Sequence, residues 1–198
     1  MNNCIAVNIQ DMLTAFGEET VKTFLSDFSC PLNENVEKFV HNNVINFARQ
    51  KLSVTYLVLK KNSKGESCLS GIFTLAHKAI TVGADSMSNT TTRKLNRFAA
   101  YNPESGKYHV SAFLIAQFGK NYAADSDCSI SGDELMKLAM DILEDAQHRI
   151  GGGVIYLDCE NIDKVLHFYQ NDNNRFVKFG ERLSSADGKQ YLQLIKFF

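Results

Sequence analysis

The sequence lacks the features that mark membrane, nucleic-acid-binding and secreted proteins. No apolar run approaches the roughly 18 residues that a membrane-spanning helix needs. The 21 basic and 22 acidic side chains give a net charge of −1, so nothing attracts the whole chain to nucleic acid or to an anionic membrane. The start of the chain, Met1 to Cys4, has neither the basic residues nor the apolar core of a signal peptide.

Cysteine and glycine motifs are also scarce. The five cysteines are an odd number without a Cys-x-x-Cys pair, and the five histidines show no metal-ligand spacing. Because disulfide frameworks and zinc sites need such spacings, we expect neither, and we expect a reduced, cytoplasmic protein without a metal. No Gly-x-x-x-x-Gly-Lys-Ser/Thr is present, which excludes the phosphate loop of nucleoside triphosphatases.

What remains is an ordinary globular composition, with 44% hydrophobic and 22% charged residues. A chain of 198 residues fits one domain with a substantial core. In the first half of the chain, the hydrophobic periodicity predicts a strand at 4–9, helices with apolar faces at 21–28 and 36–47 (the second capped by Asn33), and a hairpin of 54–60 and 67–77. An irregular insert follows at about 83–109. The second half is predicted to have a strand at 113–119, a helix from 131 to 148, a strand at 154–158, a short helix capped by Asn161, and a closing hairpin of 176–182 and 190–198. This order predicts a mixed α+β fold with helices packed on the faces of a sheet.

The stretch from 113 to 148 is the most informative part of the chain. Its helix has one continuous apolar stripe, formed by Leu135, Leu138, Ala139, Ile142, Leu143 and Ala146. The run Ser131-Gly132-Asp133-Glu134 matches a capping box, which predicts that the helix begins there. A strand that leads through a loop into a helix start gathers unpaired N–H groups, which favours an anion such as a phosphate. A purely structural role stays open, because the acidic side chains of Asp125, Asp127 and Asp133, and of Glu134 in the first helical turn, would repel phosphate.

Three other groups of residues have both a chemical and a structural interpretation. Tyr169 is either a core residue with a wet hydroxyl or a phenol that protonates a leaving group. Cys159 and His167 would form a thiolate–imidazole pair only if the fold brought them together. The basic side chains of Arg93, Lys94 and Arg97 are either a solvated face or a contact for an anionic substrate.

The order of elements and the residues on them resemble the GNAT superfamily of acyl-CoA-dependent N-acetyltransferases, over essentially the whole chain. Residues 114–119 resemble the central strand of that family, and 128–136 stand at its pyrophosphate loop and helix start. Of the family's loop pattern, Gln/Arg-x-x-Gly-x-Gly/Ala, only Gly132 is kept. Phe168-Tyr169 followed by Phe176 resembles the family's ending, in which the tyrosine is the general acid.

The resemblance implies a single GNAT-like domain over residues 1–198, with a mixed, mostly antiparallel sheet of about seven strands that is splayed at the cofactor site. It implies acetyl-CoA as co-substrate, no metal, direct attack of an amine on the thioester, and Tyr169 as general acid. The cofactor contacts that it implies are Phe118, Gly119, Lys120, Cys128, Ser129, Ile130, Ser131, Gly132 and Asn161. Asp158 and Glu160 are both candidates for the base.

Two alternatives remain. The long insert before the central strand is similar to that of the GNAT toxins of toxin–antitoxin pairs, which acetylate aminoacyl-tRNA and would add tRNA and an antitoxin as partners. The acid-rich loop is also compatible with an inert module that binds an acyl-CoA or a protein partner. The acceptor is therefore a small-molecule or aminoacyl amine, and a homodimer stays open.

Overall fold

The computed structural model describes residues 4–185 and 187–198. Met1 to Asn3, which entered the signal-peptide argument, and Ala186 in the closing hairpin lie outside the described residues. The helices are α1 (Ile9–Phe16), α2 (Glu18–Leu25), α3 (Glu34–Asn42), α4 (Val44–Arg49), α5 (Asn89–Leu95), α6 (Gly132–Ile150) and α7 (Asp163–Gln170), with a 3₁₀ turn at Ala84–Ser86. The strands are β1 (Cys4–Asn8), β2 (Val54–Lys61), β3 (Ser67–Gly83), β4 (Ala99–Asn102), β5 (Lys107–Lys120), β6 (Val154–Glu160), β7 (Val177–Leu183) and β8 (Gln190–Phe197).

Over these two described ranges the strands form an eight-stranded sheet in the order β1-β2-β3-β5-β6-β8-β7, with β4 paired to β5. The pair β5–β6 is parallel, whereas β1–β2, β2–β3, β4–β5, β6–β8 and β7–β8 are antiparallel. The predicted mixed, mostly antiparallel α+β fold is therefore confirmed. The region expected as an irregular insert contains α5, β4 and the first residues of β5.

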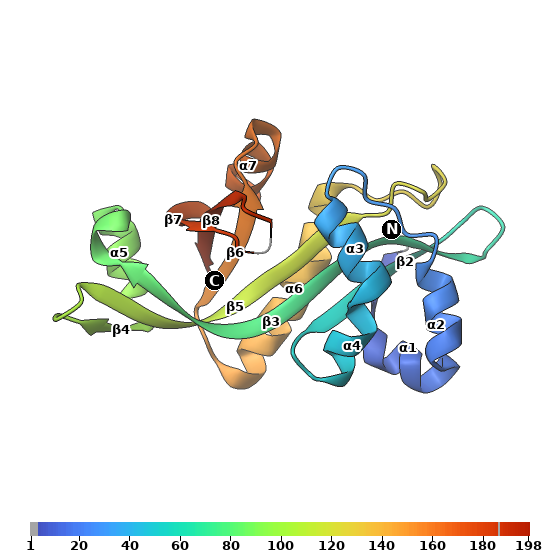
Figure 1. Ribbon diagram of the computed structural model, residues 1–198, viewed down its shortest axis with the longest axis horizontal. Helices are drawn as coiled ribbons and strands as arrows, with labels where there is room; N and C mark the ends of the chain where they lie inside the picture. The colour runs from blue at the N-terminus through green and yellow to red at the C-terminus, as the bar shows by residue number, and fades with distance from the viewer. Residues whose placement is uncertain (1–3, 186) are drawn as a thin grey trace. The chain divides into compact units, whose positions relative to one another are not determined.

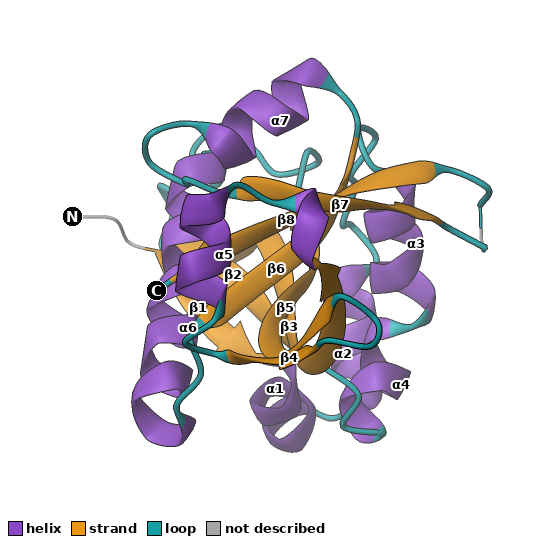
Figure 2. Ribbon diagram, turned by 90° about the vertical axis from the view of Figure 1, so that its left-hand side faces the viewer, coloured by secondary structure: helices purple, strands orange, loops and turns teal. Residues whose placement is uncertain are grey.

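The chain divides into two compact units. Unit 1 comprises the chain up to Ala76 together with Ala116–Asp141. Figures 1 and 2 show α3 and α4 on one face of its strands and α6, whose first half belongs to this unit, on the other. The surroundings of two glycines agree with this arrangement of the helices. A Cβ built at Gly119 would contact Val36 of α3, and one built at Gly71 would lie 3.4 Å from Leu135 of α6.

The core of unit 1 lies between the N-terminal helices and the strands. It consists of Ile9, Met12, Val21, Leu25, Phe28, Cys30, Val36, Phe39, Val40, Val44, Ile45, Ala48, Leu57, Leu69 and Ile72. The Asn33 side chain accepts a hydrogen bond from the N–H of Val36, which confirms the predicted N-cap. Where the sequence predicted two helices, the structure has four. The helix α1 was not expected, and Asn43 divides the second predicted helix into α3 and α4. Gly17, at φ +78°, ends α1 in a conformation that residues with a Cβ rarely adopt.

Unit 2 comprises His77–Ile115 and Ile142–Phe198. Its core consists of Val82, Leu95, Tyr108, Val110, Ala112, Val154, Tyr156, Phe179 and Ile195. The predicted closing hairpin is confirmed as β7 and β8, and Figure 1 shows α7 beside the strands β6, β7 and β8. The ladder recorded between β5 and β6 has two residue pairs, Phe113 with Ile155 and Leu114 with Tyr156. So short a ladder is what the expected splay requires.

Two further expectations from the sequence are wrong. Cys68 and Cys128, 60 residues apart, form a disulfide with a Cα–Cα distance of 6.2 Å, although the spacing of the cysteines predicted none. The N-cap of α7 is Ile162 rather than Asn161, and no side chain caps it. The expected cap moved by one residue because the Ile162 N–H bonds to the Glu160 carbonyl at 2.9 Å and forms a tight turn before the helix.

Candidate functional site

The end of β5, at Phe118, Gly119 and Lys120, is fixed by the elements packed around it. A Cβ built at Gly119 would lie 2.9 Å from Cγ1 of Val36, so only glycine lets α3 approach the strand this closely. The next residue, Asn121, donates from Nδ2 to the Leu69 carbonyl at 2.9 Å and accepts at Oδ1 from the Ser29 N–H at 3.0 Å. The backbone at the end of β5 therefore has a defined position within unit 1.

The start of α6 carries the predicted capping box, and this prediction is confirmed. The Glu134 N–H donates to Ser131 Oγ at 3.1 Å, while the Ser131 N–H donates to the Glu134 carboxylate at 2.9 Å. The arrangement fixes the first turn of a 19-residue helix. It also gives Glu134 a local partner, so its carboxylate is engaged with Ser131.

The loop before α6 offers backbone N–H groups to an anion. Within residues 4–185 and 187–198, the N–H groups of Ser129, Ile130 and Gly132 have no hydrogen-bond acceptor. The Cys128 N–H, by contrast, donates to the Asp125 carbonyl at 2.9 Å. Unsatisfied N–H groups at a helix N-terminus, with the partial positive charge of the helix behind them, are the usual elements of a phosphate site.

Contacts from β2 and the β2–β3 turn hold this loop. The Lys60 ammonium donates to the Ser129 carbonyl at 3.0 Å. The Ser63 N–H donates to Asp127 at 2.9 Å, and this bond is the main reason that the pKa of Asp127 is lowered, with the nearby charge of Lys60 adding to it. The disulfide from Cys68 ends at Cys128 in the same loop. Asp127, expected to repel phosphate, is therefore engaged with the protein and has a cation nearby.

Lys60 is the residue at this loop that sequence reasoning missed. It lies 69 residues before Ser129. The apolar pattern of its strand predicts which side chains are buried, and no local motif connects Lys60 with the loop. The one feature of the sequence that could have indicated this contact is a lysine near the end of a predicted strand. Its ammonium supplies the positive charge that the glycine-poor loop lacks.

In unit 2, Tyr169 lies in the last turn of α7 with its side chain 9% exposed. Its ring makes edge-on contacts with Phe168 and Phe176, with ring centroids 5.1 and 5.8 Å away. Burial raises the pKa of Tyr169 well above its usual value, and Cys159 raises it further. The phenol is therefore protonated across the neutral range and is able to donate a hydrogen bond.

The candidate bases and the candidate thiolate also lie in unit 2. Asp158 accepts from Arg182 Nε at 2.8 Å and Glu160 accepts from Lys189 Nζ at 2.7 Å, so each carboxylate has a cation as partner. Burial and the charge of Asp158 raise the pKa of Cys159 to about 11. Cys159 is consequently a thiol at neutral pH, which argues against the thiolate–imidazole pair.

Two further sequence features have simple surroundings. Asn161 is exposed between β6 and α7. The side chains of Arg93 and Lys94 on α5, and of Arg97 just after it, are exposed. The Lys94 ammonium lies 5.9 Å from the centroid of the Phe197 ring. In the part of the chain that the structure describes, no group of three or more His, Cys, Asp or Glu side chains could hold a metal ion. Nor is any described helix long and apolar enough to cross a membrane.

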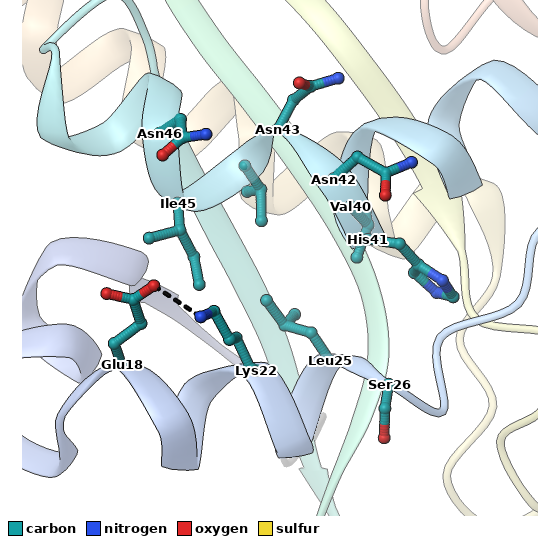
Figure 3. A pocket seen from close by; sticks show the side chains of 11 residues that line it. Glu18, Lys22, Leu25, Ser26, Val40, His41, Asn42, Asn43, Ile45 and Asn46 are labelled. Atoms are coloured by element: carbon teal, nitrogen blue, oxygen red, sulfur yellow. Dashed lines mark ion pairs between the residues drawn. The ribbon is translucent and has the colours of Figure 1, made fainter.

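Unit 1 also has a pocket of about 440 Å³ among α2, α3 and α4 (Figure 3). Leu25, Val40 and Ile45 give it an apolar floor, and an ion pair of 2.8 Å between Lys22 and Glu18 lies at its edge. None of the residues predicted to contact a cofactor lines this pocket. It is therefore separate from the loop before α6.

Neither a protein-family model nor a curated protein matches the sequence. Solved structures match the fold of the chain. A tyrosine-to-phenylalanine mutant of KacT has a TM-score of 0.63 and 13% identity, over 98% of this chain and 95% of KacT. A similar mutant of the toxin AtaT, bound to the C-terminus of the antitoxin AtaR and to acetyl-CoA, has a TM-score of 0.61 and 11% identity, over 99% and 94%.

AtaT complexed with acetyl-methionyl-tRNAfMet has a TM-score of 0.56 and 14% identity, over 85% of each chain. These toxins have the GNAT fold, so the GNAT-like fold predicted from the sequence is confirmed. At identities of 11 to 14% this similarity establishes the fold and not the role of any residue.

Proposed function

We propose that this chain is an acetyl-CoA-dependent N-acetyltransferase. The observation that carries the proposal is the group of three N–H donors at Ser129, Ile130 and Gly132, where a 19-residue helix begins and where none of the described residues supplies an acceptor. A diphosphate is the kind of ligand that such donors favour. The same fold holds acetyl-CoA in the AtaT complex, which supports this choice of ligand.

In the proposal, the loop of unit 1 binds the pyrophosphate. Ser129, Ile130 and Gly132 donate their N–H groups, Lys60 supplies positive charge, and Cys128 and Ser131 hold the shape of the loop. The backbone at Phe118, Gly119 and Lys120 pairs with the pantetheine arm as an added strand would. Asn161 remains proposed as a further contact of the cofactor.

The chemistry needs no protein nucleophile. The neutral amine attacks the thioester carbonyl, a carbon–nitrogen bond forms and the carbon–sulfur bond breaks. The nitrogen loses one proton to water, and the sulfur leaves as a thiol after gaining one proton. Holding the two reactants together supplies much of the rate. The phenol of Tyr169 donates its hydrogen to the departing sulfur, and the raised pKa of Tyr169 keeps that hydrogen in place at neutral pH.

A toxin that acetylates aminoacyl-tRNA is the more specific version of this proposal. It is favoured by the likeness to AtaT, whose structures include complexes with acetyl-methionyl-tRNAfMet and with AtaR. An antitoxin encoded beside the chain would then be its partner. An inert module with the GNAT fold is the alternative from another class, and it predicts that no acyl-CoA binds.

The proposal is tested first by binding and then by transfer. Acetyl-CoA and free CoA should both raise the melting temperature of the protein in a concentration-dependent way, because each binds the folded state. Radiolabel from acetyl-CoA should then move to aminoacyl-tRNA and not to deacylated tRNA if the acceptor is the aminoacyl amine. A melting temperature that stays constant with both ligands at millimolar concentration would favour the inert module.

A further inference from the structure

The end of α7 is held by a segment that follows it. Phe168 and Tyr169 lie in the last turn of α7. The carbonyl groups of a last turn have no N–H donor within the helix. The side-chain amide of Asn174 donates from Nδ2 to the Phe168 carbonyl at 2.7 Å. The Phe176 N–H donates to the Tyr169 carbonyl at 2.9 Å. The two carbonyls nearest the phenol-bearing residue are thus both satisfied from residues 174–176.

The backbone places Asn174 for this contact. Asn171 Oδ1 accepts from the N–H groups of Asn173 and Asn174 at 3.0 and 2.9 Å, which forms a tight turn. The Arg175 N–H then bonds to the Asn171 carbonyl at 2.9 Å, with Arg175 at φ +55°. The turn directs the Asn174 side chain inward, where it is 4% exposed.

The contact matters because α7 has only eight residues. Short helices are marginal by themselves and their last turns fray. The Tyr169 ring packs edge-on against Phe168, whose carbonyl Asn174 holds, and against Phe176, which follows two residues after Asn174. Loss of the amide would remove a hydrogen bond from a half-buried carbonyl and would loosen the turn that carries the phenol.

We propose that Asn174 is a positioning residue for the Tyr169 phenol. By donating to the Phe168 carbonyl, it fixes the last turn of α7 and so fixes the hydroxyl in the place where the departing sulfur needs a donor. The inference rests on the proposed function, because it gives Tyr169 a role that requires placement. A displacement of about 1 Å is enough to lower turnover by about 10²-fold.

The test compares Asn174→Ala and Asn174→Asp with Asn173→Ala, a matched control in the same turn whose side chain is exposed. Turnover is followed as release of CoA from acetyl-CoA with a pool of aminoacyl-tRNA. We expect both Asn174 variants to lower kcat at pH 8 by about tenfold or more, with the KM for acetyl-CoA within about twofold of wild type. The control should match wild type.

The Asn174→Asp variant adds a pH dependence of kcat that a purely structural role of Asn174 would not produce. A carboxylate repels the Phe168 carbonyl, whereas a protonated carboxyl donates to it as the amide does. The kcat of Asn174→Asp relative to wild type should therefore rise as the pH is lowered from 8 to 5.5. A ratio that stays constant over this range contradicts the inference.

A second arm does not depend on turnover. In protein labelled with ¹³C on the tyrosine rings, the NMR signal of Tyr169, assigned through Tyr169→Phe, should shift or broaden in Asn174→Ala and remain unchanged in Asn173→Ala. An unchanged Tyr169 signal in Asn174→Ala would overturn the inference. This arm applies even if no acceptor is turned over.

The two proposals fail in different ways. If Tyr169→Phe keeps full turnover, the general-acid role in the proposed function fails. If Tyr169→Phe is slow but Asn174→Ala is as fast as wild type, the proposed function stands and the positioning role fails. In the Tyr169→Phe background, Asn174→Ala should change kcat by less than about twofold, because its effect acts through the phenol. A further tenfold loss there would contradict the inference.

Discussion

At the scale of single residues, Tyr169 is the position on which the proposed chemistry depends. Tyr169→Phe should lower kcat by about 10²-fold, as loss of an acid catalyst typically does, and should leave the affinity for acetyl-CoA unchanged. The pKa of Tyr169 is raised, so the active, protonated form persists to higher pH than in a free tyrosine. We therefore expect no fall in kcat from this group below about pH 10. Steady-state kinetics over pH 6 to 10 would check the loss in kcat and its pH dependence, and calorimetric titration would check the affinity.

Gly132 is the second residue whose substitution is informative. Gly132→Glu should weaken acetyl-CoA binding, because it adds a negative charge beside the free N–H groups and restricts close approach of the ligand. Asn96→Glu, which adds the same charge at the exposed C-cap position of α5, is the matched control. Calorimetric titration that gave Gly132→Glu the affinity of the control would remove the loop from the proposed site.

Residues differ in how far the sequence could identify them. Tyr169 and Gly132 belong to local patterns, an aromatic pair on a helix and a capping box, so both could be proposed before the structure. Lys60 could not, because its contact with Ser129 depends on the pairing of distant strands. Asn174 could not either, because the sequence shows an asparagine in a turn and not the burial that makes its amide matter.

At the scale of elements, the disulfide between Cys68 and Cys128 ties the start of β3 to the loop before α6. Closing a loop with a sequence separation of 60 should stabilise the fold by about 4 kcal/mol in the chain-entropy model. A reductant should therefore lower the melting temperature of the wild-type protein. It should leave the double variant Cys68→Ser, Cys128→Ser unchanged. Equal sensitivity of both proteins to reductant would show that the bond does not contribute.

Elements with strong periodicity were predictable, and short ones were not. The helix that begins at the capping box and the closing hairpin follow from regular apolar spacing over many residues. In contrast, β4 has four residues and no buried position, so nothing in its sequence separates it from a loop. The helix α1 has eight residues, and its first residue, Ile9, continues the alternation of Ile5 and Val7 in the preceding strand.

At the scale of the whole molecule, the order of the elements was enough to suggest the GNAT fold, but not the acceptor. Expression of a toxin that acetylates aminoacyl-tRNA should arrest bacterial growth, and co-expression of an antitoxin encoded beside it should restore growth. Tyr169→Phe, produced at the same level, is the control and should be harmless. Normal growth with abundant soluble wild-type protein would argue against the toxin, and a general acetyltransferase would remain as the proposed function.

The contact between Gly119 and Val36 affects how mutational scans of this chain should be interpreted. Because the extra carbon would collide with α3, Gly119→Ala would displace a helix as well as alter the strand edge. Any loss of ligand affinity in that variant could come from misplaced packing alone. Shortening the obstacle at the same time, as Gly119→Ala with Val36→Ala, would separate the two causes.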